Sequence, residues 1–306
     1  MNMADRLGVY SRERAMQNRI DTEKTESLID ALPFIQRFRG HTFVIKYGGA
    51  AMEDDHLVER LLRDVVFLEA VGINPVVIHG GGKAISQRMR EMGKTPRFVS
   101  GLRVTDAETI AAVEEVLDHL ILPRIVATVK SFNGEAEGFS GRDVFLAKRL
   151  APVPEGKTMV DVGYVGEVVS LELEQIREAI EREVVPVISP IARSETGDLL
   201  NVNADIAAGA MAGALKAEKM IYVSDVLGVM RDVKNPASLI PRLDRESSMK
   251  LMDEGIIEAG MIPKVQSALS ALEQGVNKVH FVDGRLPHAL LAEVFTAEGI
   301  GTEIIP

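Results

Sequence analysis

Residues 42–49 read TFVIKYGG and residues 74–83 read NPVVIHGGGK. Each stretch is a short apolar run that ends at adjacent glycines, which is typical of a buried strand followed by a tight turn. Three more β-rich runs follow, at Val184–Ser189, Lys219–Ser224 and Lys278–Asp283. Strands that are apolar along most of their length predict a largely parallel sheet with both faces covered.

The segments between these strands have the periodicity of helices. Residues 54–71 place leucine and valine on one face, and further helices are expected at 106–121, 203–216 and 264–274. The residues of 203–216 are nearly all small, so this helix can lie very close to a sheet. Strands that alternate with helices predict an α/β fold, with the alternating residues 159–169 as a hairpin at its rim.

One more helix is expected before the first strand, at residues 21–38. Its apolar residues recur close to helical spacing, and Pro33 should kink the helix or end its first part. The resulting apolar stripe needs a surface to cover it. The sequence leaves open whether that surface belongs to the same domain or to another subunit.

The composition excludes several classes of protein. The 306 residues are 46% hydrophobic and carry a net charge of −10, which argues against disorder and against a nucleic-acid-binding face. The chain has no cysteine, so disulfides and cysteine metal sites are excluded. No apolar run is long enough to span a membrane, and the polar N-terminus lacks the apolar core of a secretory signal. A cytoplasmic protein is expected.

Glycine-rich turns follow three of the predicted strands, at residues 46–49, 79–83 and 224–228. Glycine lets backbone N–H groups approach an anion closely, and ligands of open α/β sheets bind beyond the carboxyl ends of the strands. Two common nucleotide motifs do not fit. A P-loop would need serine or threonine at Ala84, and a dinucleotide fingerprint would need glycine at Ile85. The turns therefore indicate anion binding of another kind.

Two lysines and one aspartate are candidates for phosphoryl transfer. Lys46 ends an apolar strand, where a lysine is costly unless it meets an anion. Lys264 opens a helix, where a cation opposes the helix dipole. Asp205 lies in the run NVNAD at the start of the small-residue helix. Alone, each lysine is more often a surface residue, and an N-cap is as good an interpretation of the polar run as a functional site. Together they supply the charges that phosphoryl transfer to a carboxylate requires, without a general base.

Arg103 lies in the run GLRVTD, directly before a predicted helix. Arginine suits the bidentate capture of a carboxylate. A loop arginine paired with Asp106 is an equally good interpretation of the sequence alone.

Eight segments, taken together and in order, resemble the N-acetylglutamate kinases of the amino-acid kinase superfamily. They are IKYGGAAM, VVIHGGGKAIS, GLRVTD, DVGYVGEV, NVNADIAA, SDVLGV, GMIPK and DGRLPHALLAEVF, within residues 21–305. The resemblance implies an open αβα sandwich with a mostly parallel central sheet. It also implies ATP-dependent phosphorylation of the side-chain carboxylate of N-acetyl-L-glutamate, a step of arginine biosynthesis.

The resemblance implies a role for each candidate residue. Lys46 and Lys264 match two lysines that stabilise the transferred phosphoryl group, and Asp205 matches the acid that orients them. The acetylglutamate site would comprise Gly81, Gly82, Arg103 and Asn201. The phosphate and ATP site would comprise Gly48, Gly49, Ser224, Asp225, Gly228, Gly260 and Met261. Mg²⁺ would enter with ATP, held mainly by phosphates and waters, and no metal site made of protein residues is expected.

The resemblance also implies regulation by L-arginine. Arginine-inhibited relatives have a kinked N-terminal helix that interlaces dimers into a hexamer. The arginine site would comprise Phe34, His280, Glu293, Gly299 and Gly301. Phe34 stands where some relatives have tyrosine, and Ser131–Phe139 departs from the commoner pattern. A nitrogen-signalling protein is a further partner that the sequence leaves open, whereas nucleic acid and membranes are not expected.

Three regions are expected along the chain. They are an N-terminal extension with the interlacing helix at 1–39, an acetylglutamate-binding and dimerisation lobe at 40–217, and an ATP-binding lobe at 218–306 that also holds the arginine site. Two alternatives to the implied function stay open. One is another kinase that forms an acyl phosphate, on aminoadipate, glutamate or carbamate. The other is a non-catalytic arginine sensor.

Overall fold

A central sheet of eight strands dominates the computed structural model, which describes residues 25–52, 54–257 and 260–306. The order of these strands is β14 (Arg242–Leu243), β16 (Thr302–Ile304), β15 (Lys278–Asp283), β13 (Lys219–Ser224), β1 (Thr42–Tyr47), β2 (Asn74–His79), β10 (Val185–Ile188) and β5 (Ala136–Phe139). Neighbours run parallel, except that β15 and β16 are antiparallel. The predicted sheet is confirmed, and β1, β2, β13 and β15 have the predicted bounds.

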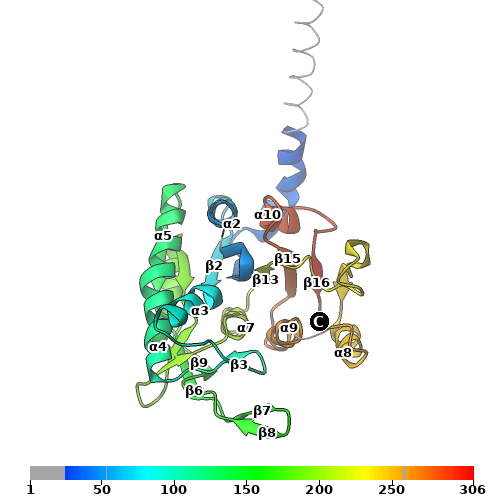
Figure 1. Ribbon diagram of the computed structural model, residues 1–306. Coiled ribbons are helices and arrows are strands. Elements are labelled where there is room, and N and C mark those ends of the chain that lie inside the picture. Colours follow the sequence, from blue (N-terminus) through cyan, green and yellow to red (C-terminus); the bar gives the residue numbers. More distant parts are fainter. Residues whose placement is uncertain (1–24, 53, 258–259) are drawn as a thin grey trace, which may run out of the picture.

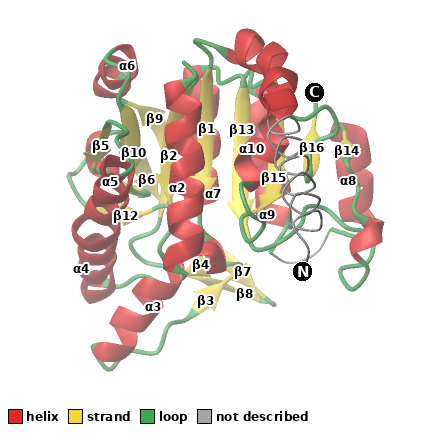
Figure 2. Ribbon diagram, turned by 90° about the horizontal axis from the view of Figure 1, so that it is seen from above, coloured by secondary structure: helices red, strands yellow, loops and turns green. Residues whose placement is uncertain are grey.

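Helices cover both faces of this sheet (Figure 1, Figure 2). One face carries α2 (Asp55–Ala70), α5 (Leu122–Ser131) and α10 (Ala289–Val294). The other carries α6 (Glu174–Glu181), α7 (Ala204–Leu215), α8 (Arg245–Asp253) and α9 (Ile262–Glu273). Successive residues of a strand face opposite layers, so Val44 belongs to one core cluster and Ile45 to the other. The open αβα sandwich is confirmed.

The helix expected at 106–121 is longer than predicted and has three parts. α4 (Ala107–Glu114) continues directly into the π-helix η2 (Glu115–Ile121) and then into α5. π-Helical turns are rare and occur frequently at functional sites. Helix α3 (Gly82–Glu91) packs against α4 and η2. The described residues also form the short 3₁₀ helices η1 (Gly49–Met52), η3 (Gly141–Asp143) and η4 (Pro236–Ser238).

A smaller sheet and two hairpins contain the other described strands. The sheet has the order β12 (Leu199–Asn201), β11 (Ile191–Arg193), β6 (Phe145–Arg149) and β9 (Gly166–Leu171). The hairpins join β3 (Phe98–Val99) to β4 (Leu102–Arg103) and β7 (Val153–Glu155) to β8 (Thr158–Val160). The prediction of one hairpin over 159–169 is wrong, because β8 pairs with β7 whereas β9 pairs with β6. The chain turns between them at Gly163, which has φ +79° and leaves no room for a Cβ beside the Thr105 carbonyl.

The N-terminal helix stands out from the body of the protein (Figure 1). Residues 25–38 are helical on both sides of Pro33, so Pro33 does not end the helix, and the alternative that it kinks the helix stays a prediction. Phe38 is buried and packs edge-on against Phe43. Leu28 and Ile29, by contrast, are 65% and 62% exposed. This part of the apolar stripe therefore does not pack on the described part of its own domain. Residues 1–24, which include most of the predicted extension at 1–39 and the first residues of the helix expected at 21–38, lie outside the described residues.

The two hydrophobic cores cross the predicted lobe boundary after residue 217. The core around Val44 includes Met220 and Val279, and the core around Ile45 includes Ile221 and Val282. The division into lobes therefore stays a prediction. Among the described helices, none has the length and apolar character needed to cross a bilayer.

Candidate active site

Three elements bring the candidate lysines and aspartate together. Lys46 projects from β1 on the same face as Val44, toward the layer that contains α7. Asp205 lies in the first turn of α7, where the side chain of Asn203 caps the helix by accepting from the Asp205 and Ile206 N–H groups. Lys264 lies in the first turn of α9. The interpretation of the NVNAD run as an N-cap is confirmed for Asn203.

One carboxylate holds both lysines. Lys46 Nζ lies 2.9 Å from Asp205 Oδ1, and Lys264 Nζ lies 2.7 Å from Oδ2. The contact of Lys264 with Oδ2 is a hydrogen bond. Oδ1 accepts no well-aligned hydrogen bond in the described part of the chain, so its contact with Lys46 is an ion pair. All three groups are largely buried, with Lys264 the most exposed at 17% of its side chain.

Burial and mutual charge change the pKa values of this group. Burial, together with the nearby Lys264 ammonium, lowers the pKa of Lys46, although Asp205 opposes this change. Burial alone would raise the pKa of Asp205, but the two lysines outweigh it and the pKa is lowered. Asp205 is therefore an anion at neutral pH, and it offsets the repulsion between two cations that lie against the same carboxylate.

Small residues allow α7 to lie close enough to α9 for these contacts. A Cβ on Gly209 would come within 2.5 Å of Ser267 Oγ, and one on Gly213 within 2.3 Å of the Gln274 side chain. Ser267 Oγ also donates a hydrogen bond to the backbone carbonyl of Asp205, at 2.8 Å. The run of small residues thus permits close packing on a neighbouring helix, which the sequence did not show.

A cavity of about 270 Å³ lies on the Lys46 side of the carboxylate. All four residues expected to bind the acceptor line it, namely Gly81, Gly82, Arg103 and Asn201. Lys46, Asp205 and Gly49 line it as well. Phe98, Leu102, Val165 and Asn203 are lining residues that sequence reasoning missed. Three of them are apolar and Asn203 is a helix cap, so nothing in the sequence marked them as residues of a binding cavity.

Arg103 is held beside this cavity by its own neighbours. Its Nη2 donates to the Gly82 carbonyl at 2.6 Å and to Ser86 Oγ at 2.8 Å, and its guanidinium carbon lies 4.6 Å from the centre of the Phe98 ring. The alternative pairing with Asp106 is wrong. Asp106 instead caps α4 and pairs with Lys94, at 2.6 Å.

A second cavity, of about 550 Å³, lies on the Lys264 side. Of the residues expected to bind ATP, Asp225, Gly228, Gly260 and Met261 line it. Ser224 ends β13 and is buried, and its hydroxyl has no hydrogen-bond partner within the described residues. Gly48 lies apart from the cavity lining. A Cβ there would come within 2.6 Å of Lys46 Nζ, so this glycine leaves room for the lysine.

His79 ends β2 directly before the second glycine turn and is fully buried. Burial lowers the pKa of His79 to about 4, from about 6.5 in an unfolded chain. The folded state therefore binds fewer protons than the unfolded state between these values, so stability falls as the pH drops from about 6.5 toward 4.

We expect this histidine to contribute to acid sensitivity. Between pH 7 and pH 4, its titration should lower the free energy of unfolding by about 3 kcal/mol, because each pKa unit is worth about 1.4 kcal/mol. Urea unfolding at several pH values, compared with the His79→Asn variant, measures this contribution. Parallel losses in both proteins would show that other groups cause the acid sensitivity.

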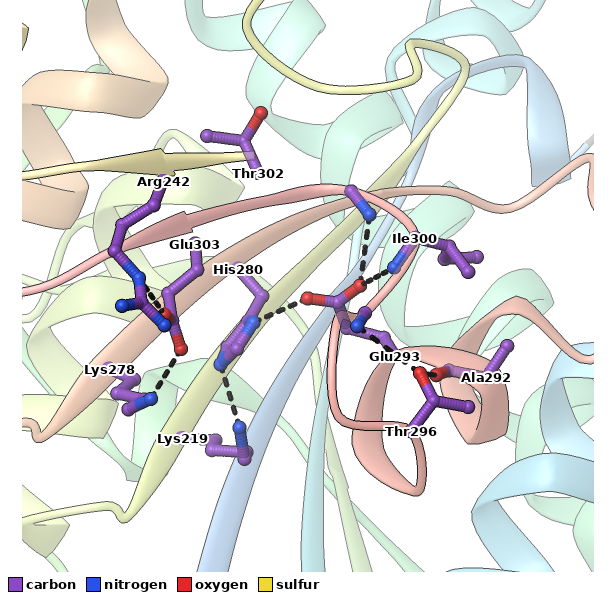
Figure 3. Close-up of polar contacts among 12 residues, drawn as sticks. Lys219, Arg242, Lys278, His280, Ala292, Glu293, Thr296, Ile300, Thr302 and Glu303 are labelled. Carbon is purple, nitrogen blue, oxygen red and sulfur yellow. Dashed lines mark hydrogen bonds and ion pairs between the residues drawn. The ribbon is translucent and has the colours of Figure 1, made fainter. Parts of the chain in front are cut away.

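A third cavity, of about 470 Å³, lies between the N-terminal helix and the carboxyl-terminal part of the chain. Four of the residues expected to bind arginine line it, namely Phe34, His280, Glu293 and Gly299. Figure 3 shows a chain of contacts there: Lys219 Nζ lies 2.9 Å from His280 Nε2, and His280 Nδ1 lies 2.6 Å from Glu293. The other Glu293 oxygen accepts from the N–H groups of Ile300 and Gly301.

Sequence reasoning missed several charged residues of this third cavity. Lys219, Lys278, Arg242 and Glu303 line it, and Glu303 accepts from both Arg242 and Lys278. Burial, with the Lys278 charge nearby, lowers the pKa of Lys219 to about 8. Lys219 and Lys278 each begin a strand that is otherwise mostly apolar, and this position was the signal that could have found them.

Known proteins are similar to this chain over most of its length. Residues 41–283 match the amino acid kinase family. An acetylglutamate kinase of Akkermansia muciniphila is 48% identical over 284 residues, which are 92% of this chain and 96% of that protein. One of Methanocaldococcus jannaschii is 49% identical over 288 residues, with the same coverage of 92% and 96%.

A solved structure shares the fold. It is N-acetylglutamate synthase from Neisseria gonorrhoeae complexed with coenzyme A and N-acetyl-glutamate, with a TM-score of 0.81 and 25% identity. The match covers 92% of this chain and 63% of the synthase chain, so this chain spans less than two thirds of that protein.

Proposed function

Since the chain belongs to the amino acid kinase family, we propose that it transfers the γ-phosphoryl group of ATP to the side-chain carboxylate of N-acetyl-L-glutamate. One observation carries this function. Asp205 holds two lysines, of which Lys46 lines one cavity and Lys264 lines another. The relatives that are 48% and 49% identical are acetylglutamate kinases.

The arrangement suits phosphoryl transfer between the two cavities. The acceptor lies in the cavity of Lys46 and Arg103, and ATP lies in the cavity of Lys264. A carboxylate nucleophile, with a pKa near ~4, is already ionised at neutral pH and needs no general base. What the site supplies is positive charge on both sides of the transferred group, where charge changes during the reaction. Mg²⁺ enters with ATP, because it prefers phosphate oxygens and waters.

The charges of the acceptor cavity favour an acetylated amino acid. Lys46 and Arg103 are cations, and an unmodified glutamate would bring its own ammonium group next to them. An acetyl group removes that charge and leaves two carboxylates for the cations and for the Gly81 and Gly82 N–H groups. This argument ranks acetylglutamate above glutamate and aminoadipate, which both carry an ammonium. The intact lysine–aspartate cluster likewise favours an enzyme over a non-catalytic sensor.

A coupled assay of ADP release tests the function directly. Acetylglutamate, glutamate, aminoadipate and carbamate are offered in turn as acceptors, with ATP and Mg²⁺. Turnover with acetylglutamate well above that with the other three supports the proposal. Equal or faster turnover with glutamate would overturn the choice of acceptor, and no turnover with any of them would overturn the kinase.

We also propose that L-arginine binds the third cavity and inhibits the enzyme. The cavity presents carboxylates (Glu293, Glu303) that suit a guanidinium and cations (Lys219, Lys278) that suit an α-carboxylate. Phe34 of the N-terminal helix closes one wall. Binding there would connect arginine to the helix that carries the exposed Leu28 and Ile29.

The exposed stripe of this helix supports a hexamer built from dimers. Leu28 and Ile29, with Leu32 at 44% exposure, form an apolar surface that nothing covers among the described residues. A second subunit would bury it. Light scattering that shows only dimers, with activity unchanged in millimolar arginine, would reject both regulation and hexamer.

The arginine site has its own variant. Glu293→Gln removes the charge that faces a guanidinium and leaves one acceptor oxygen where the carboxylate has two, one on His280 and one on the Ile300 and Gly301 N–H groups. We expect the arginine concentration for half inhibition to rise about tenfold or more, the effect of losing one charge-assisted hydrogen bond. The matched control is Glu178→Gln on the exposed face of α6. An unchanged inhibition curve would contradict the assignment.

A further inference from the structure

The peptide unit between Gly80 and Gly81 is held in one orientation. The preceding unit is fixed by the Gly80 N–H, which donates to the Tyr47 carbonyl at 2.7 Å and continues the pairing of β1 with β2. The Gly80 carbonyl lies 3.0 Å from Nδ1 of His79. A carbonyl oxygen only accepts, so Nδ1 must carry the proton and donate it.

This contact determines where the Gly81 N–H points. In a trans peptide the C=O and N–H groups of one unit point in opposite directions. Because the Gly80 carbonyl is turned toward the buried His79 ring, the Gly81 N–H is turned away from it. Gly81 lines the acceptor cavity. Neither its N–H nor that of Gly82 donates to a backbone acceptor within residues 25–52, 54–257 and 260–306.

The histidine ring is placed there at a cost. Its Nε2 is buried and has no hydrogen-bond partner within the described part of the chain. Asp118 is the nearby acidic group, but its oxygens already accept from Ser189 and Ser140, at 2.5 and 2.6 Å. A phenyl ring would fill a similar volume without an unpaired nitrogen. A polar ring buried at this cost calls for a reason, and the bond to Gly80 supplies one.

The π-helix η2 supports the same turn from the other side. A Cβ on Gly81 would come within 2.5 Å of Leu117 and 2.9 Å of Ile121, both in η2. The turn therefore lies between a side chain that orients it and a helix that leaves no room for a side chain at Gly81. Such support is what a backbone donor needs to bind a carboxylate in one geometry.

We propose that His79 is a positioning residue, whose Nδ1–H bond to the Gly80 carbonyl aims the Gly81 N–H at the carboxylate of the acceptor. The inference rests on the proposed function, because the acceptor cavity is assigned there. His79 does not touch the acceptor and acts through the backbone of the turn. Loss of the His79 side chain should therefore lower kcat/KM for the acceptor and leave the KM for ATP unchanged.

A series of variants tests this role. The amide nitrogen of asparagine can take the place of Nδ1, that of glutamine lies one carbon further along, and leucine has no donor. We expect His79→Leu and His79→Gln to lower kcat/KM for acetylglutamate about 10- to 100-fold. This is the typical effect of losing one hydrogen-bond donor to a charged group, here the Gly81 N–H to the acceptor carboxylate. His79→Asn should stay within about threefold of wild type. The KM for ATP should change less than about twofold in all three. His56→Leu, at an exposed histidine, is the control.

The pattern of results decides the inference. Asparagine rescue with a selective loss for acetylglutamate supports it. Equal losses in the Asn and Gln variants, or a KM for ATP that rises in parallel, would overturn it. If His79→Leu does not fold, as seen by circular dichroism, the Asn and Gln pair decides alone. Wild type is measured on the same acceptors, so a failure of the proposed kinase activity shows there first. The variants are then compared on whichever acceptor wild type uses.

Discussion

Replacing Lys264 by alanine should lower kcat by about 10²- to 10³-fold, since that is the typical effect of removing one preorganised charge from a transition state. Lys264 lines the cavity proposed for ATP and not the cavity proposed for the acceptor. Its charge is therefore available to the leaving side of the transferred group. The affinity for acetylglutamate, measured by calorimetry without ATP, should stay within about threefold of wild type.

The control for this variant is Lys250→Ala. Lys250 lies on α8 with 73% of its side chain exposed, and its ion-pair partner among the described residues is distant, Glu254 at 3.9 Å. It should leave kcat unchanged, because exposed pairs of this kind contribute little. An undiminished kcat in Lys264→Ala would remove Lys264 from the mechanism. An equal loss of acetylglutamate affinity would show that this lysine belongs to acceptor binding instead.

Replacing Asp205 by asparagine should affect both stability and catalysis. The substitution keeps the shape of the side chain but leaves Lys46 and Lys264 without the anion that both contact. Breaking a buried ion pair by removing one partner typically costs about 3–5 kcal/mol. We expect a loss of this size in urea unfolding near pH 7, with a kcat that falls at least about 10²-fold because the lysines lose their orientation.

Asp253→Asn is the matched control for this prediction, because Asp253 is exposed at the end of α8. It should change neither measurement. If Asp205→Asn unfolds at the same urea concentration as wild type, the ion-pair cluster is not a source of stability. If kcat also stays within about twofold, the orienting role of Asp205 is rejected.

The strands most accessible to sequence reasoning were the buried ones. β1, β2, β13 and β15 are apolar runs bounded by turns, so their pattern and their bounds agree. β5 reads AEGF and β14 has two residues, so neither has a pattern of its own. Such strands exist because a neighbouring strand offers a free edge, and this is a property of the assembled sheet.

At the candidate active site, too, the sequence predicted some features and the tertiary structure decided the others. Lys46, Asp205 and Lys264 were identified as chemically suited to one reaction, but their contacts depend on how α7 packs against α9. The alternative partner of Arg103 shows the limit of local reasoning. Asp106 is three residues away and oppositely charged, yet it caps α4 and pairs with Lys94. Sequence proximity did not predict the partner of Arg103. The Asp106 carboxylate is engaged in capping α4, and the β3–β4 hairpin directs the Arg103 side chain elsewhere.

By itself, the sequence determined the α/β class, the central strands, the three glycine turns and the types of residue that phosphoryl transfer requires. These are local properties, since they depend on side-chain periodicity and on the freedom of glycine. Only the tertiary structure decided that one carboxylate holds two lysines, with Lys264 reaching Asp205 across 59 residues of sequence. It also decided that His79 orients the turn next to it and that the charges of the third cavity gather beside the N-terminal helix. These contacts depend on which faces of the sheet and helices meet, and that is settled by packing over the whole chain.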